Sequence, residues 1–209
     1  MRGLHAAPDG DAMQTEHAQQ SALQHDRLHD DIERVLVPSA AIAARVAALA
    51  AAIGEDYAHA DGRLTVVPVM TGSLLFAADL VRALPQRRMR IQLATVSSYG
   101  GTATASRGSQ LVGALPKHLE GHHVLIVDDI LDSGGTLRLL RAEFESRGAA
   151  SVRACTLLRK KLASAMSTPC EYVGFDIGDE FVVGYGLDYD DLYRNLPYVG
   201  TLRREARGG

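Results

Sequence analysis

Two adjacent carboxylates, Asp128 and Asp129, are the residues of this 209-residue chain best placed to do chemistry. They follow the apolar, β-branched run 124–127, which is typical of a strand buried on both faces. After them come Asp132, the small-residue loop 133–136 and a helical pattern. A short polar loop between a strand and a helix presents backbone N–H groups to a phosphate, so this stretch predicts a phosphate site.

The acid pair restricts the ligand that such a loop would bind. Carboxylates repel a phosphate unless they accept hydrogen bonds from sugar hydroxyls or hold a divalent metal that also contacts the phosphate. Asp128 and Asp129 therefore predict a ligand that combines a phosphate, a diol and a divalent metal. That combination describes the 5-phosphate end of a ribose.

The elements that must position these residues alternate between strands and helices along the chain. Strands are expected at residues 64–69, 90–96, 123–127, 151–158 and 171–177. Helices are expected from the N-cap Ser39 to a stop at Gly54, and over 73–84 before Pro85. This alternation predicts an α/β fold with a mostly parallel central sheet flanked by helices.

In such a sheet, ligands bind at the carboxyl ends of the strands. Four features of the sequence lie at predicted strand ends: residues 70–73, Ser98-Tyr99, 128–136 and Lys160. The run 97–109 is long, small and polar, which is typical of a lid that closes over substrate. These features predict one shared site at one edge of the sheet.

Composition and missing motifs exclude several other functions. The net charge of −3 does not favour nucleic acid, and the two cysteines lack the spacing of a metal site. No N-terminal apolar signal is present, and the apolar run 40–53 is too short to span a bilayer, so we expect a cytoplasmic protein without membrane contact. The P-loop, dinucleotide and nucleophile-elbow motifs are all missing.

Residues 124–137 resemble the phosphoribosyl pyrophosphate signature of type I phosphoribosyltransferases. Residues 97–100, 156–160 and 181–189 resemble the hypoxanthine-guanine branch of that family, and the likeness extends from about residue 35 to 200. It implies a single domain over 32–209, with a core of about 60–178 and a small hood subdomain from the chain ends, about 32–40 and 179–205. Residues 1–31, which are polar and poor in large apolar side chains, are expected to form a disordered tail.

The resemblance implies roles for the acid-pair stretch. Asp128 and Asp129 contact the ribose hydroxyls and Mg²⁺, and Asp132 lies at the purine N7 as its acid/base partner. The 5-phosphate is held by Ser133, Gly134, Gly135 and Thr136.

The pyrophosphate loop is implied at Met70, Thr71 and Gly72, where the family has an unusual cis peptide. Thr71 departs from the family pattern, which commonly has Lys or Arg at this position. We therefore expect weaker or differently tuned donor binding, because a side-chain charge is lost while the backbone contacts remain.

The remaining implied residues surround the base and the leaving group. Ser98 and Tyr99 belong to the closing lid and are assigned with Asp132 to catalysis. Lys160 contacts the exocyclic oxygen of the purine. The base stacks on Phe181 and is read through the backbone of Val182, while Asp188 helps to hold Mg²⁺ and Arg194 contacts pyrophosphate.

The implied reaction transfers ribose 5-phosphate from phosphoribosyl pyrophosphate to hypoxanthine or guanine, with Mg²⁺ as cofactor. Lys160 offers donors for a 6-oxo group and no acceptor for a 6-amino group, which favours 6-oxopurines over adenine. Alternatives are a xanthine-preferring or pyrimidine relative, and a non-catalytic nucleotide-sensing regulator on the same fold. The family is usually dimeric or tetrameric, so a homo-oligomer is expected.

Overall fold

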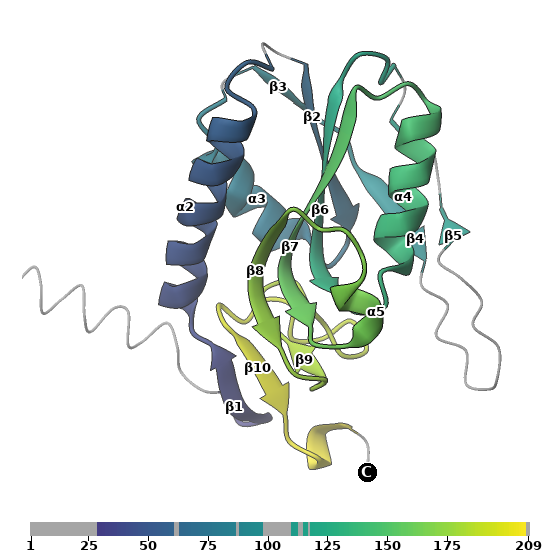
Figure 1. The fold of residues 1–209 in the computed structure, drawn as a ribbon. Helices are drawn as coiled ribbons and strands as arrows, with labels where there is room; N and C mark the ends of the chain where they lie inside the picture. Colours follow the sequence, from purple (N-terminus) through teal and green to yellow (C-terminus); the bar gives the residue numbers. More distant parts are fainter. Residues whose placement is uncertain are drawn as a thin grey trace, which may run out of the picture.

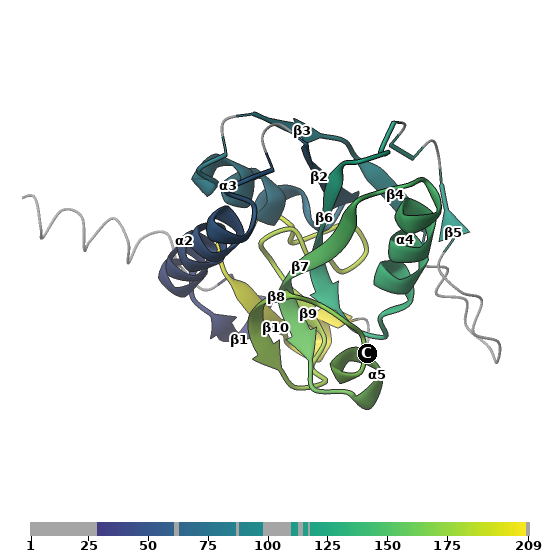
Figure 2. The same cartoon turned by 45° about the horizontal axis from the view of Figure 1, so that its top comes forward.

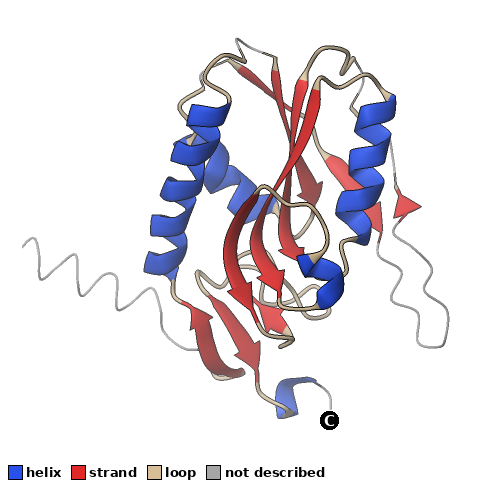
Figure 3. Ribbon diagram, viewed as in Figure 1, coloured by secondary structure: helices blue, strands red, loops and turns tan. Residues whose placement is uncertain are grey.

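The computed structural model describes residues 29–60, 63–86, 88–97, 110–112, 115–116 and 118–207. The strands in this part of the chain form one seven-stranded sheet and one three-stranded sheet. Figures 1 and 3 show the larger sheet between helices, with the smaller sheet beyond the arrowheads of the central strands. The carboxyl ends of the central strands therefore face the small sheet.

The central sheet has the order β5-β4-β2-β6-β7-β8, with β3 paired to β2. Every pairing is parallel except β4 with β5. This arrangement confirms the predicted α/β fold with a mostly parallel sheet. The strands are β2 (Leu64–Met70), β3 (Met89–Ile91), β4 (Ala94–Ser97), β5 (Gln110–Leu111), β6 (His123–Leu131), β7 (Ser151–Lys160) and β8 (Tyr172–Ile177).

Helices cover both faces of this sheet, as Figures 1 and 2 show. Leu125 and Val127 of β6 belong to the hydrophobic cluster that includes α2 and α3, whereas Val124 and Ile126 belong to the cluster that includes α4 and α5. Because successive strand residues point to opposite faces, β6 must be apolar at every position of this run. The helices are α2 (Ser39–Asp56), α3 (Leu74–Ala83), α4 (Gly135–Ser146) and α5 (Ala163–Met166).

The small sheet joins the two ends of the described chain. It has the order β1-β10-β9 and is antiparallel, with β1 at Ile32–Val37, β10 at Val199–Leu202 and β9 at Val182–Val183. A 3₁₀ turn, Glu205–Arg207, follows β10. Ile32, Tyr198 and Leu202 are fully buried in its core. We call this sheet and the chain 179–207 the hood.

The strand predicted at 90–96 is wrong in one respect, because two short strands occupy it. β3 pairs with the first half of β2, and β4 pairs with its end. Both pairings keep the same register, from Leu64↔Met89 to Met70↔Thr95, but the pairing is interrupted between them. The gap lies opposite the part of β2 that contains Pro68. Proline has no N–H to donate to a ladder, which explains the interruption.

The predicted ends of the first helix are also wrong. Ser39 is the first residue inside α2, Pro38 occupies the N-cap position, and the helix continues through Gly54 to Asp56. Gly54 is buried against α3's end, where an added Cβ would lie 2.4 Å from Cγ of Pro85. The glycine therefore allows close packing and does not end the helix.

The predicted tail lies outside the described residues except for its last three positions, which contact the hood. The backbone N–H of His29 donates to the hydroxyl of Tyr198 at 3.0 Å, and the hydroxyl of Tyr193 donates to Asp31 at 2.9 Å. Within the described chain, contacts with the hood are thus already present at His29 and Asp31. In the described chain no helix has the length and apolar character needed to span a membrane.

Candidate active site

The acid pair lies in the second half of β6, and the strand continues past it to Leu131 and stays paired with β7. Asp128 is 7% exposed. Burial raises the pKa of Asp128 well above its ordinary value, and the neighbouring carboxylate of Asp129 raises it further. Burial also raises the pKa of Asp129, although Arg194 partly opposes this. The two carboxylates therefore bring negative charge together where little water can screen it. Hydrogen bonds from ligand hydroxyls, or a bound cation, would offset this charge.

The predicted phosphate loop follows directly and ends at the N-terminus of α4. Gly134 occupies the N-cap position with a φ of 78°, a left-handed conformation that favours glycine. Arg138, one turn into α4, donates to the carbonyl of Ser133 at 3.0 Å and to Thr168 Oγ1 at 2.7 Å. These bonds hold the loop in place, so residues 133–136 can present their N–H groups to an anion.

The predicted pyrophosphate loop packs against the acid pair. The peptide between Met70 and Thr71 is cis, as the resemblance implies. A Cβ on Gly72 would lie 1.7 Å from Asp129 Oδ2, so only glycine leaves room for the carboxylate. Ser73 is fully buried and donates to the carbonyl of Val69 at 2.6 Å, which ties the loop to the end of β2.

Asp188 and Arg194 lie together on the hood side of the site. The guanidinium of Arg194 is 2.8 Å from Asp188 and 2.8 Å from Asp191, and it donates to the carbonyl of Gly186 at 2.9 Å. A Cβ on Gly186 would lie 2.0 Å from the carbonyl oxygen of Gly72. The hood loop thus packs directly on the predicted pyrophosphate loop.

Lys160, the last residue of β7, reaches Asp132 across the strand ends. Its Nζ is 3.4 Å from Asp132 Oδ2 and 3.0 Å from Asp179 Oδ1. Burial lowers the pKa of Lys160, but the carboxylates of Asp179 and Asp132 outweigh this and raise it. The two residues assigned to the base are therefore in contact, and the ammonium is held in its charged form.

Phe181 and Val182 complete the predicted base site. Phe181 is 43% exposed, and its ring meets that of Tyr189 edge-on at 5.6 Å between centroids. Val182 is buried in β9 and pairs with Thr201 of β10. An exposed aromatic face beside a fixed strand is suited to stacking on a planar base.

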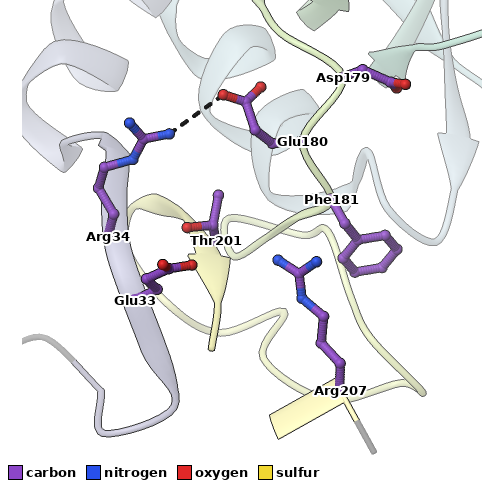
Figure 4. Close-up of a pocket in the computed structure, with 7 residues that line it drawn as sticks. All are labelled: Glu33, Arg34, Asp179, Glu180, Phe181, Thr201 and Arg207. Atoms are coloured by element: carbon purple, nitrogen blue, oxygen red, sulfur yellow. Dashed lines mark hydrogen bonds and ion pairs between the residues drawn. The ribbon is translucent and has the colours of Figure 1, made fainter. Parts of the chain in front are cut away.

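A pocket of about 530 Å³ opens on the hood side of the segment 179–181. In Figure 4, Arg34 points toward Glu180, with 3.4 Å between guanidinium and carboxylate, while Asp179 points away from both. Of the predicted site residues, Phe181 contributes to its wall. The pocket is lined by Glu33, Arg34, Asp179, Glu180, Phe181, Thr201 and Arg207.

Two predicted residues and two unpredicted ones remain to be placed. Ser98 and Tyr99 lie outside the described residues, so the lid stays a prediction. Arg138 and Asp179 were not predicted, although each contacts a predicted residue. Arg138 lies four residues after Gly134, a spacing that returns a helix side chain to the loop before it. Asp179 follows β8, and its partner Lys160 lies 19 positions earlier at the end of β7. No spacing within a single element therefore links the two residues.

The metal assignment has mixed support. Within the described residues, no group of three or more His, Cys, Asp or Glu side chains is arranged to hold a metal, so Asp188 is not gathered with Asp128 and Asp129 into one cluster. Mg²⁺ usually binds one or two carboxylates together with substrate phosphates and water. The buried, like-charged pair fits that smaller role.

The burial of Asp128 generates a prediction about stability. Because its folded-state pKa is raised, the charged carboxylate costs stability at pH values above that pKa, and the cost disappears at low pH, where the group is protonated in both states. We expect Asp128→Asn to increase the free energy of unfolding at pH 8 by on the order of 1 kcal/mol, measured by urea denaturation without ligands. The gain should vanish toward pH 4.

Asp176→Asn is the matched control, because it neutralises an aspartate at the end of the next strand but one. Hydrogen bonds from Arg159 lower the pKa of Asp176, so its charge stabilises the fold above its unfolded pKa. This substitution should reduce stability at pH 8. Equal losses in both variants would contradict the assignment of Asp128 as a strained charge.

Comparisons with known proteins agree with this geometry. A family model described as the phosphoribosyl transferase domain matches residues 36–190. The hypoxanthine-guanine phosphoribosyltransferase of Mycobacterium tuberculosis is 43% identical over 176 residues, which cover 82% of this chain and 87% of that protein. The hypoxanthine phosphoribosyltransferase of Escherichia coli is 41% identical over 168 residues, covering 80% of this chain and 94% of the relative.

A solved structure shows the same relation in three dimensions. The hypoxanthine phosphoribosyltransferase of Staphylococcus aureus superposes with a TM-score of 0.79 and 37% sequence identity, over 87% of this chain and 97% of the other. Sequence match, fold and the packing of the loops around the acid pair agree. The chain belongs to the phosphoribosyltransferase family and, within it, to the hypoxanthine-guanine branch that its motifs predict.

Proposed function

We propose that this chain is a purine salvage enzyme that transfers ribose 5-phosphate from phosphoribosyl pyrophosphate to hypoxanthine, guanine or both, giving IMP or GMP and pyrophosphate. The observation that carries the proposal is the contact of Lys160 with Asp132 beside the acid pair and the phosphate loop. A 6-oxopurine needs a donor for its exocyclic oxygen and an acid/base partner for its ring nitrogen. These two side chains supply both.

The donor side of the proposed reaction uses the strand-end loops. The N–H groups of residues 133–136 bind the 5-phosphate, and the acid pair accepts hydrogen bonds from the ribose hydroxyls. Arg194 and the backbone of residues 70–72 stabilise the negative charge that develops on the leaving pyrophosphate. The lid predicted around Ser98 and Tyr99 would exclude water and so limit hydrolysis of the donor.

On the acceptor side, the base stacks on Phe181 and its oxygen accepts a hydrogen bond from Lys160. As the ring nitrogen bonds to the anomeric carbon, Asp132 takes up the proton that the base releases. The half-exposed position of Asp132, with 53% of its side chain accessible, leaves it open to a substrate. The Val182 backbone is assigned to the edge of the base.

We propose Mg²⁺ as the cofactor. The carboxylates assigned to it are Asp128, Asp129 and Asp188, of which only the adjacent pair Asp128 and Asp129 lies together, and this pair has negative charge that a cation would offset. When bound, the ion neutralises charge on the diphosphate of the donor.

We also propose that the protein is a homodimer or homotetramer. Leu74 and Leu75, in the first turn of α3, are 49% and 37% exposed, and Leu75 lines a groove of about 400 Å³ with Ile42 and Leu196. Contact with a second copy would remove this apolar surface from water. Light scattering on the full chain should give two or four times the mass of 22.4 kDa, and a monomer would contradict the proposal.

A panel of bases tests the proposed activity directly. With phosphoribosyl pyrophosphate and Mg²⁺, hypoxanthine and guanine should be converted to nucleotides, while adenine is not, because Lys160 cannot accept a hydrogen bond from an amino group. Uracil, a pyrimidine, should not be converted either. If xanthine were the best substrate, that result would support the xanthine-preferring alternative. Nucleotide or RNA binding with no transfer to any base would support the regulator.

Replacing Asp132 tests its proton-transfer role. Asp132→Asn should lower kcat by roughly 10²–10⁴, because the amide cannot take up a proton, while both substrates still bind. Calorimetry should therefore give dissociation constants close to those of the wild type. The control is Asp190→Asn, an exposed aspartate beyond the site, which should leave kcat unchanged. Wild-type turnover in Asp132→Asn would remove the assigned role.

A further inference from the structure

The Lys160 ammonium lies between two carboxylates, and the proposed reaction uses only one of them. Asp132 is 3.4 Å from Nζ, whereas Asp179 is 3.0 Å away and accepts a hydrogen bond. The lysine side chain is 13% exposed, so its charge is largely removed from water. A desolvated ammonium needs compensation, and Asp179 supplies the shorter of the two contacts.

The chain around Asp179 is fixed on the sheet side. Just before it, Arg159 of β7 binds Asp176 of β8 through two hydrogen bonds of 2.7 and 3.1 Å. The backbone N–H of Lys161 donates to the carbonyl of Ile177 at 2.9 Å. These contacts set the end of β8 beside the end of β7, where Lys160 is.

The next two side chains after Asp179 contact the hood and not the lysine. Glu180 pairs with Arg34 of β1, and Phe181 meets Tyr189 edge-on. Figure 4 shows Asp179 pointing away from the Glu180–Arg34 pair. Three successive side chains thus point to three different partners, and only Asp179 points to the lysine.

The geometry matters because Lys160 and Asp132 have different tasks in the proposed reaction. If Asp132 were the only carboxylate near the ammonium, the two would form a closed ion pair. That pair would compete with the substrate for both groups, since the lysine must donate to the base oxygen and the aspartate must accept a proton. A second carboxylate in contact with the ammonium, at 3.0 Å, relieves this competition.

We propose that Asp179 is a positioning residue for the base: it shares the Lys160 ammonium with Asp132 and so keeps the lysine charged without a closed pair to Asp132, and each of the two can then meet its own atom of a 6-oxopurine. The proposal rests on the proposed function. It makes Asp179 a determinant of base affinity, and it leaves binding of phosphoribosyl pyrophosphate to other residues.

The pH dependence follows from the charges around the lysine. Asp132 faces Lys160 from the loop after β6 and Asp179 from the connection after β8, while its chain neighbours Arg159 and Lys161 add positive charge and Asp176 pairs with Arg159. The two carboxylates raise the pKa of Lys160 against the effect of burial. Removing the charge of Asp179 lowers that pKa, so the ammonium is lost at a lower pH.

The experiment compares Asp179→Asn with the wild-type full chain. The KM for hypoxanthine should rise roughly tenfold, as expected for loss of one charge-assisted hydrogen bond that orients the lysine, while the KM for phosphoribosyl pyrophosphate stays within about twofold. The basic limb of kcat/KM for hypoxanthine should move to lower pH. Asp179→Glu, which keeps the charge, should have a KM for hypoxanthine and a basic limb close to those of the wild type.

Glu180→Gln is the matched control, since it removes a carboxylate from the next position, whose partner is Arg34. It should leave the KM for hypoxanthine and the pH profile unchanged. An unchanged KM and an unshifted basic limb in Asp179→Asn would overturn the proposal. Equal increases in both KM values would overturn it too, because they would indicate a structural role.

A titration without substrate separates this inference from the proposed function. NMR of lysine-labelled protein should show the Lys160 ammonium titrating at lower pH in Asp179→Asn and at the wild-type pH in Glu180→Gln. An unshifted resonance in Asp179→Asn would overturn the role of Asp179 whatever the enzyme's activity. Failure of the wild type to use any 6-oxopurine would instead contradict the proposed function.

Discussion

The structure depends on holding two carboxylates next to each other, one buried and one half-buried. Asp128 and Asp129 repel, and burial denies them the solvent that would screen the repulsion. Such a pair persists only when the surrounding fold holds it in place. Here β6 lies between β2 and β7 and is covered by helices on both faces, so its end cannot relax. The central strand of the larger sheet thus carries this unfavourable pair of charges.

The loops around the pair are shaped by the same constraint. Gly72 has no side chain because Asp129 occupies that space, and Gly186 has none because Gly72 is there. Arg194 brings a positive charge to this side and lowers the pKa of Asp129 against the effect of burial. The backbone of Gly186 in the hood packs on the backbone of Gly72, and Gly72 packs on the carboxylate of Asp129. These contacts link the hood to β6. Glycines in this site therefore act through the contacts they permit.

The parts of the fold that could be predicted from sequence are those set by local pattern. The run before Asp128 is apolar at each position because both faces are covered, and the loop and helix after it follow from small residues and helical spacing. The contacts between distant segments could not be predicted in this way. Gly54 has the sequence signature of a helix end, yet its packing partner Pro85 lies 31 positions further along the chain and keeps the helix intact.

Asp179 shows the same limit for the site. Its role depends on how β7 and β8 align, with Lys160 opposite Ile177, and on the course of the chain after β8. No spacing within a single element contains that information. Asp132 and Lys160 were predicted through the resemblance, whereas a carboxylate that acts on one of them from a third segment had no signal of its own.

The order of strands in the hood has a consequence for how the protein is made. β1, near the start of the described chain, finds its partner only in β10, near the end, and β9 pairs with the same strand. During synthesis, β1 and β9 therefore remain unpaired edges until β10 has emerged, although the central sheet can already form. The proposed base site, which includes Phe181 and Val182, is assembled last. A nascent or shortened chain that lacks β10 would hold an intact phosphate loop without a finished place for the acceptor, and would expose strand edges that a chaperone or a protease can bind.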